Sequence, residues 1–152
     1  MLQIQIRPYY RLKISTADLK IAADLALKKC KQTEVVAGIF ITGDAEMHAL
    51  NREYRGIDQT TDVLSFNENY IDPDSGLEYL GDIIISVPRA KKQALEGGHT
   101  IEQEIQVLVV HGILHLSGYD HDTKLRQKKM WQLQAEILKE LNNPLAGQFA
   151  TG

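Results

Sequence analysis

The sequence predicts one α+β domain, in which a small mixed β-sheet of about four strands packs against about five helices, including a central helix that bears histidines. Three observations predict this fold. A chain of 152 residues with 43% hydrophobic and 24% charged side chains is typical of a single globular domain. Short segments with strand composition are interspersed with segments of helical periodicity. One helical segment, residues 101–116, is apolar around most of its circumference, which places it in the centre of the fold.

The N-terminal part of the chain is predicted to contain two strands and two helices in alternation. Residues 2–6 alternate apolar and polar side chains, as in a half-buried strand. A capping-box pattern that begins at Ser15 starts an amphipathic helix over about 16–31. The β-branched, apolar run 34–42 predicts a buried strand, and Asp44 is expected to cap the short helix that follows.

The rest of the chain is predicted to contain two strands and three helices. A short strand at 63–66 is followed by an expected loop over 67–78 and by a strand over 80–86. Proline, glycine and capping-box signals, together with apolar periodicity, indicate helices over residues 88–97, 101–116 and about 122–142. We expect a single domain over 1–143 and a frayed C-terminal tail over 144–152.

Composition and charge narrow the class of protein. The single cysteine, Cys30, cannot form an internal disulfide, and no apolar run approaches the roughly 18 residues of a membrane span. The first residues lack the apolar stretch of a signal peptide, so we expect a cytoplasmic protein with no membrane partner. The net charge of −3 argues against wrapping by nucleic acid, but residues 1–31 carry seven basic and two acidic side chains. Residues 62–82 carry six acidic and no basic ones, so a polyanion has to approach a local basic surface.

Three of the five histidines lie within eleven residues, at His111, His115 and His121. The first two are one helical turn apart, and Gly118 allows a turn that brings the third back to complete a three-nitrogen metal site. Buried imidazoles without a metal would each need a hydrogen-bond partner. One ion satisfies all three; zinc suits three imidazoles best, and nickel, copper and iron stay open. Asp120 either orients a ligand or caps the turn.

The histidine spacing matches the H-E-x-x-H-x-x-G-x-x-H pattern of metzincin proteases at the ligands and the glycine. Position 112 differs, because those proteases have a glutamate there as general base and this chain has Gly112. A glycine has no side chain to take a proton. The chain therefore has the three metal ligands of the metzincin pattern but lacks its general base.

Longer motifs carry a resemblance to a known family. HGILHLSGYDH at 111–121 resembles the H-G-x-L-H-L-x-G-Y-D-H signature of the YbeY family, bacterial metal-dependent endoribonucleases of rRNA maturation. LNREYRGIDQTTDVLSF at 50–66 and LGDI at 80–83 resemble two further family segments, in the same order and spacing. Thr60 and Asn67 stand where the family usually has proline, and we expect these departures to loosen the loop after Arg55.

The resemblance implies that His111, His115 and His121 bind one zinc ion and that Arg55 is the catalytic arginine. In that role a guanidinium would hold the oxygens of a phosphodiester transition state while the metal activates a water or polarises a phosphoryl oxygen. From the local sequence alone, without the family resemblance, Arg55 is interpreted as a cation at a helix C-terminus that pairs with a nearby carboxylate, Asp58 or Asp62. The general base stays open between metal-bound hydroxide, the RNA 2′-hydroxyl and a set of three carboxylates: Asp62, Asp82 and Asp120.

The implied function is endonucleolytic processing of the 16S rRNA 3′ end and ribosome quality control, with precursor rRNA and the small ribosomal subunit and its proteins as partners. Two alternatives are a non-catalytic assembly factor that binds pre-rRNA and a metal-dependent hydrolase of another substrate. The oligomeric state stays open. The basic N-terminal part offers one RNA-binding patch: Arg7, Arg11, Lys13, Lys28, Lys29 and Lys31. A competing patch follows the histidines: Lys124, Arg126, Lys128 and Lys129.

Overall fold

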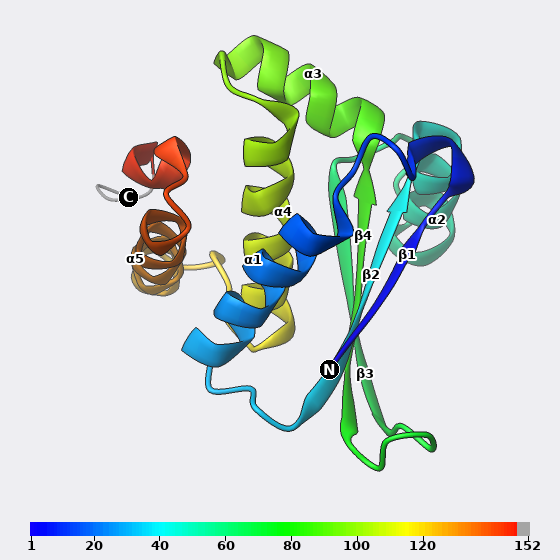
Figure 1. Ribbon diagram of the computed structural model, residues 1–152, viewed down its shortest axis with the longest axis vertical. Helices are drawn as coiled ribbons and strands as arrows, with labels where there is room; N and C mark the ends of the chain where they lie inside the picture. The colour runs from blue at the N-terminus through cyan, green and yellow to red at the C-terminus, as the bar shows by residue number, and fades with distance from the viewer. Residues whose placement is uncertain (149–152) are drawn as a thin grey trace.

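The computed structural model describes residues 1–148 and confirms the predicted α+β fold, with a four-stranded sheet and five α-helices (Figure 1). The strands are β1 (Leu2–Ile6), β2 (Val35–Thr42), β3 (Val63–Ile71) and β4 (Glu78–Ser86). They lie in the order β1-β2-β4-β3. β1 pairs parallel with β2 and β2 parallel with β4, whereas β3 pairs antiparallel with β4, so the sheet is mixed.

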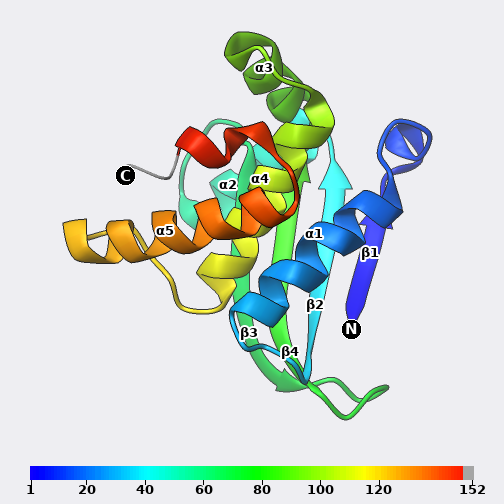
Figure 2. The same ribbon diagram turned by 60° about the vertical axis from the view of Figure 1, so that its left-hand side comes forward.

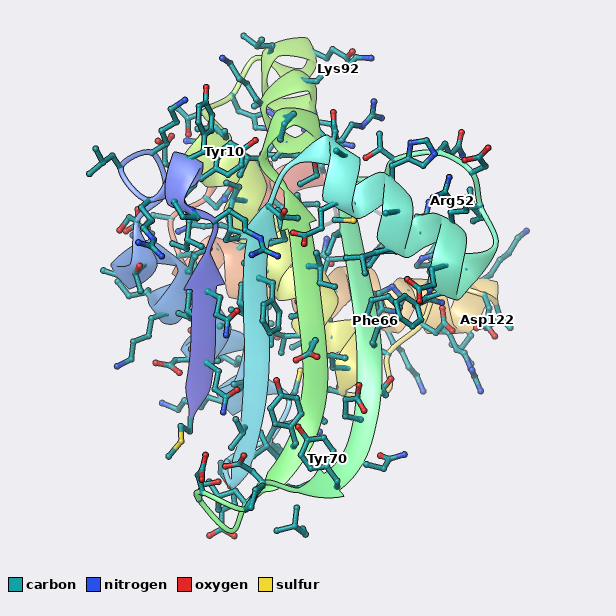
Figure 3. The ribbon with its side chains drawn as sticks, turned by 90° about the vertical axis from the view of Figure 1, so that its right-hand side faces the viewer. Tyr10, Arg52, Phe66, Tyr70, Lys92 and Asp122 are labelled. Atoms are coloured by element: carbon teal, nitrogen blue, oxygen red, sulfur yellow. The ribbon has the colours of Figure 1, made fainter. Side chains whose placement is uncertain are left out.

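The α-helices are α1 (Thr16–Lys29), α2 (Asp44–Arg55), α3 (Val87–Gly97), α4 (Ile101–Leu116) and α5 (Lys124–Glu140). Two short 3₁₀ helices, η1 (Pro8–Tyr10) and η2 (Pro144–Gln148), complete the described part. α1 and α4 cover one face of the sheet, and α5 lies on the outer side of α4 (Figures 1 and 2). α2 covers the upper part of the opposite face (Figures 1 and 3). None of the described helices is long and apolar enough to cross a membrane.

The hydrophobic core lies between the sheet and α4, which explains the apolar circumference of this helix. Ile83 and Ile85 of β4 are fully buried against Ile113 and Leu114 of α4. A Cβ atom at Gly112 would lie 2.9 Å from three side-chain atoms of Ile83. The absence of a side chain at Gly112 therefore lets α4 approach the sheet closely, and this position faces β4.

Two predicted boundaries in the first half of the chain are wrong in detail. The expected loop over 67–78 is too long, because β3 continues to Ile71 and only residues 72–77 form the turn. Asn67 and Tyr70 at the two ends of this polar segment pair with β4, with a register shift between them, since an edge strand tolerates polar side chains and bulges. Asp44 is the first residue of α2 and not its cap; its carboxylate accepts hydrogen bonds from Ser86 and Thr60.

The C-terminal segment also differs from its prediction. Residues 144–148, expected to fray, form the helix η2, and Leu145 is buried against the core. The side-chain oxygen of Asn143 accepts a hydrogen bond from the Leu145 backbone N–H at 2.9 Å, which holds the start of η2. The rest of the predicted tail, 149–152, lies outside the described residues.

Candidate metal centre

The structure brings the three predicted histidines together at the C-terminal end of α4. His111 and His115 lie on successive turns, and their Nε2 atoms are 3.1 Å apart. The helix ends at Leu116 with Ser117 as its C-cap, and Gly118 adopts a left-handed conformation with φ of 98° that turns the chain back. His121 thereby joins the other two, and one ring nitrogen from each histidine lies within 4.8 Å of the others.

This donor set fits a divalent ion. With its Nδ1 directed at the oxygen of Gln134, His111 presents the lone pair of Nε2 to the other two histidines, and an imidazole lone pair is a ligand for a divalent ion. Zinc binds imidazole nitrogen at about 2.0–2.1 Å, which puts neighbouring tetrahedral ligands about 3.4 Å apart. The three nitrogens are thus close enough that small side-chain movements would let all of them bind one ion.

Gln134 of α5 orients the first histidine, and sequence reasoning missed it. Its side chain is only 1% exposed, and its Oε1 lies 3.1 Å from Nδ1 of His111. The amide oxygen accepts the Nδ1 proton, which leaves the lone pair on Nε2, the atom that faces His115. The available signal was a polar residue on the buried face of α5, between the core positions Met130 and Ile137.

The electrostatic environment keeps the imidazoles neutral. Burial, and after it the charge of His115, lowers the pKa of His111 to about 4. Burial, then the charge of His121, lowers the pKa of His115, with a smaller contribution from Arg55. The charge of Asp62 opposes the shift at His111. Neutral imidazole is the form that ligates metals.

Asp120 caps the turn. Its Oδ1 accepts a hydrogen bond from the backbone N–H of His121 at 2.7 Å. Of the two alternatives that the sequence left open, this contact supports the cap. The carboxylate fixes the backbone that presents His121, and its charge opposes part of the lowering of the His115 pKa.

Arg55 stands at the C-terminal end of α2, where Gly56 ends the helix in a left-handed conformation. The exposed guanidinium donates a hydrogen bond to the carbonyl oxygen of Ser65 at 2.7 Å and lies 5.3 Å from the ring centroid of Phe66. Across residues 1–148, no ion pair joins Arg55 to a carboxylate. The positive charge is therefore available to a ligand.

The two carboxylates suggested as partners of Arg55 are engaged elsewhere. Asp58 contacts Nε2 of His48 at 2.7 Å. Asp62 accepts hydrogen bonds from Gln93 at 3.2 Å and from the backbone N–H of the following residue at 2.8 Å. The interpretation of Arg55 as a helix-terminal ion-pair partner is therefore wrong for this chain.

The two departures from the family pattern tie the loop down, contrary to the expectation that they loosen it. The Thr60 hydroxyl donates to Asp44 at 3.1 Å, and Asn51 donates to the Gln59 carbonyl at 2.8 Å. Asn67 donates to the carbonyl oxygen of Leu116 at 2.9 Å. This last bond joins β3 to the terminal turn of the histidine helix, where helix carbonyls lack intrahelical partners.

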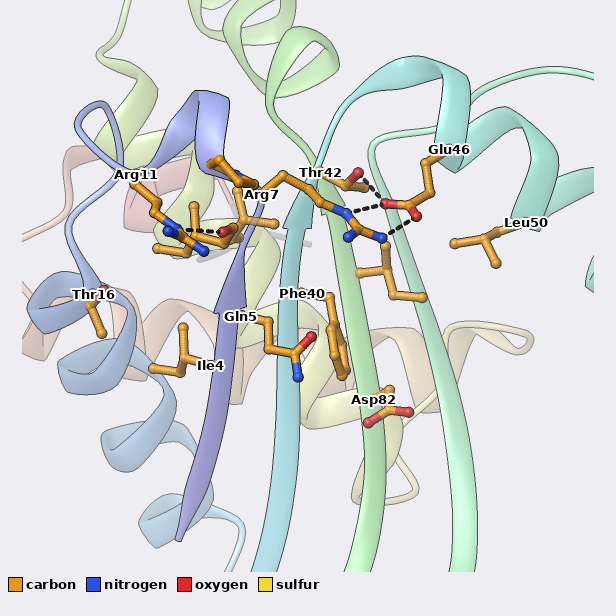
Figure 4. A pocket seen from close by; sticks show the side chains of 14 residues that line it. Ile4, Gln5, Arg7, Arg11, Thr16, Phe40, Thr42, Glu46, Leu50 and Asp82 are labelled. Atoms are coloured by element: carbon orange, nitrogen blue, oxygen red, sulfur yellow. Dashed lines mark hydrogen bonds and ion pairs between the residues drawn. The ribbon is translucent and has the colours of Figure 1, made fainter.

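The N-terminal basic patch is partly neutralised, and its first residues follow the edge strand β1. Arg7 pairs with Glu46, with Nε to Oε1 at 3.0 Å, beside a hollow of about 690 Å³ on the sheet (Figure 4). Lys29 pairs with Glu140 at 2.7 Å. β1, which leads into this patch, is the edge strand farthest from β3. The remaining members are exposed: Arg11, Lys13, Lys28 and Lys31.

The competing basic patch lies beside the metal centre. α5 begins at Lys124, three residues after His121, and Trp131 on the same helix has its ring centroid 5.8 Å from that of His121. Arg126 makes an ion pair with Asp122 at 3.5 Å. Lys124 and its neighbours at 128 and 129 are exposed, so this end of α5 presents positive charge next to the histidines.

A three-imidazole site at the end of a central helix, beside an arginine free of ion pairs among the described residues, defines a metal-dependent hydrolase. The family whose description is Endoribonuclease YbeY matches residues 9–142. Its member from Acholeplasma laidlawii is 40% identical over 139 residues, 91% of this chain and 98% of its own. The member from Brevibacillus brevis is 46% identical over 122 residues, 72% of this chain and 76% of its own.

A solved structure agrees with these relatives. The solution structure of a Thermotoga maritima protein superposes with a TM-score of 0.60 at 25% identity, covering 97% of this chain and 95% of its own. The chain belongs to the YbeY family, and with it to the metal-dependent endoribonucleases.

Proposed function

We propose that this protein is a zinc-dependent endoribonuclease that hydrolyses phosphodiester bonds in precursor rRNA. Its zinc ligands are His111, His115 and His121, and Arg55 is the catalytic arginine. It acts in 16S rRNA 3′-end maturation and ribosome quality control, with the small ribosomal subunit and its proteins as partners. The observation that carries the proposal is the convergence of three histidine nitrogens in a chain that belongs to this family.

In the proposed mechanism, the bound metal, Gln134 and Arg55 have separate roles. Zinc supplies a Lewis acid that lowers the pKa of water or polarises a phosphoryl oxygen. Gln134 holds the ligand tautomer of His111. The guanidinium of Arg55 offers a planar pair of donors to the equatorial oxygens of the transition state, where negative charge concentrates.

All three carboxylates considered as bases accept hydrogen bonds from other groups of the chain, Asp62 from Gln93 and from the backbone N–H of the following residue. Asp120 accepts from the backbone of His121. Asp82 accepts from the Tyr79 hydroxyl and lines the hollow on the sheet face opposite α4 (Figure 4). Asp62 is the carboxylate whose charge acts on His111.

The test is cleavage of a structured precursor rRNA 3′-end fragment by metal-loaded protein. We expect His115→Ala and Arg55→Ala each to lower the rate at least about a hundredfold, in the range of losses seen when a transition-state donor is removed. The matched control is Arg52→Ala, because Arg52 is an exposed arginine one turn earlier on the same helix. It should retain the rate.

Each other outcome contradicts the proposal in a defined way. Equal cutting by all variants would identify a contaminating ribonuclease. No cutting by folded, metal-loaded wild type would favour the non-catalytic assembly factor. Hydrolysis of another ester or amide in place of RNA would favour a different metal-dependent hydrolase.

A further inference from the structure

Resting on the proposed function, we propose that Tyr54 and Phe66 form a subsite that stacks a nucleobase of single-stranded RNA next to the scissile phosphate. The two ring centroids are 5.5 Å apart at an interplanar angle of 61°. Tyr54 is 61% exposed at the last turn of α2. A tyrosine left so exposed on a helix that otherwise packs on the sheet presents a ring surface to solvent.

Arg55 connects this aromatic pair to the metal centre. Its guanidinium lies 5.3 Å from the Phe66 ring centroid, and it bonds the carbonyl of Ser65 on the same strand. Asn67, two residues further along this strand, donates a hydrogen bond to the carbonyl oxygen of Leu116, one residue after His115 on α4. Arg55 is therefore anchored on the strand segment that joins the aromatic rings to the end of the histidine helix, so a phosphate held by Arg55 has an adjacent base within reach of the rings.

The position of β3 keeps the subsite accessible. β3 is an edge strand, and Phe66 lies on the face of the sheet away from α4, beneath the C-terminal end of α2 (Figure 3). Its neighbour Asn67 points the other way, to the carbonyl of Leu116 on α4. A strand of RNA crossing this edge passes from the histidine side, over Arg55, to the aromatic side.

The chemistry of the subsite favours a nucleic acid over a peptide. Single-stranded nucleic acid is bound by aromatic rings that stack bases beside cations that hold phosphates. Here an exposed ring flanks a guanidinium that has no ion-pair partner among residues 1–148. A base-paired strand has no free base face to offer, so the subsite selects unpaired RNA.

The experiment measures binding of a short single-stranded RNA that carries 2-aminopurine at successive positions. We expect quenching at one position with wild type, and for Tyr54→Ala a binding constant weaker by about tenfold with the quenching lost. Tyr54→Phe keeps the ring and should retain both. The matched control is Tyr9→Ala, because Tyr9 is 71% exposed on η1 near the opposite sheet edge.

Cleavage kinetics separate this subsite from the proposed function. Tyr54→Ala should raise KM with little change in kcat, since stacking binds substrate and transition state alike. If wild type fails to cut while Tyr54→Ala still loses binding and quenching, the proposed function falls and the subsite stands. If wild type cuts and Tyr54→Ala binds and quenches equally, the subsite is wrong and the exposed ring serves a protein contact.

Discussion

The ring of His111 has two nitrogens, and the structure gives each a different neighbour. Nδ1 meets the amide oxygen of Gln134, and Nε2 meets His115. Without Gln134, the Nδ1 proton would be buried without an acceptor, or the tautomer would reverse and remove the ligand lone pair. Gln134 is thus a positioning residue for the metal centre.

We predict that Gln134→Leu weakens zinc affinity about 10- to 100-fold, as loss of a partner behind a histidine ligand does. Gln134→Glu keeps an oxygen acceptor and should bind zinc as tightly as wild type. The measurement is competition with a chromophoric chelator. Gln132→Leu, two residues away on the exposed side of α5, is the control. Equal affinity for Gln134→Leu and wild type would contradict the role.

At the scale of elements, α4 is held on the sheet by a close contact and by a hydrogen bond. Gly112 allows the contact with Ile83, and Asn67 of β3 bonds the carbonyl of Leu116. The glutamate that metzincins carry at the position of Gly112 would here point into the sheet. The missing peptidase base therefore follows from how this helix packs.

We predict that Gly112→Ala destabilises the protein by about 1–3 kcal/mol, although alanine normally favours a helix over glycine. The added methyl would lie 2.9 Å from Ile83, which has to move. The measurement is the free energy of unfolding in urea. The double variant Gly112→Ala/Ile83→Ala should show a favourable coupling energy between the two sites; strict additivity would mean that the contact is not the cause.

We predict that Asn67→Ala lowers the free energy of unfolding by about 1 kcal/mol, the usual contribution of one hydrogen bond whose carbonyl partner is left partly buried. Asn69→Ala, at an exposed position two residues along the same strand, is the matched control and should stay within about 0.5 kcal/mol of wild type. The same urea titrations serve both variants. An equal loss of unfolding free energy in both variants would show that the strand, and not the hydrogen bond to α4, is responsible.

At the scale of the whole molecule, the buried histidines link stability to pH. The pKa of His111 falls from its ordinary 6.5 to about 4 on folding, chiefly through burial. Between these values the unfolded chain binds a proton that the folded chain does not, so acid favours unfolding. Stability is fully present above about pH 6.5 and is lost as the pH falls towards 4.

We predict that the metal-free protein loses about 2 kcal/mol of unfolding free energy between pH 7 and pH 5. The experiment is urea unfolding in the presence of a chelator. His111→Gln should flatten the pH dependence, whereas His48→Gln, which changes a half-exposed histidine, should not. An equally steep profile for His111→Gln would assign the effect to other groups.

The parts of the fold that are local in sequence were predictable. Apolar periodicity gave the five helices and the four strands, and the spacing of His111, His115 and His121 gave their convergence, because a helix and one turn are enough to bring them together. Tertiary contacts were not predictable in this way. Gln134 meets His111 across 23 residues, and Asn67 meets Leu116 across 49.

The wrong predictions share a physical cause. The polar run 67–70 has no alternating pattern, and its pairing depends on the neighbouring β4. Asp44 has the composition of a cap, but the Ser86 hydroxyl from another strand supplies a better donor for its carboxylate. In each case a partner distant in sequence decided the local conformation.

The histidine segment has a consequence for how the protein acquires its metal during synthesis. All three imidazoles come from residues 111–121, and closing so short a loop costs little chain entropy. We therefore expect a nascent chain that lacks α5 to form a weak metal site already. Gln134 is synthesised later, with α5, so we expect this helix to tighten a metal site that the earlier residues already form. The unfolded chain keeps some affinity as well, which lessens the stability that bound metal adds to the folded state.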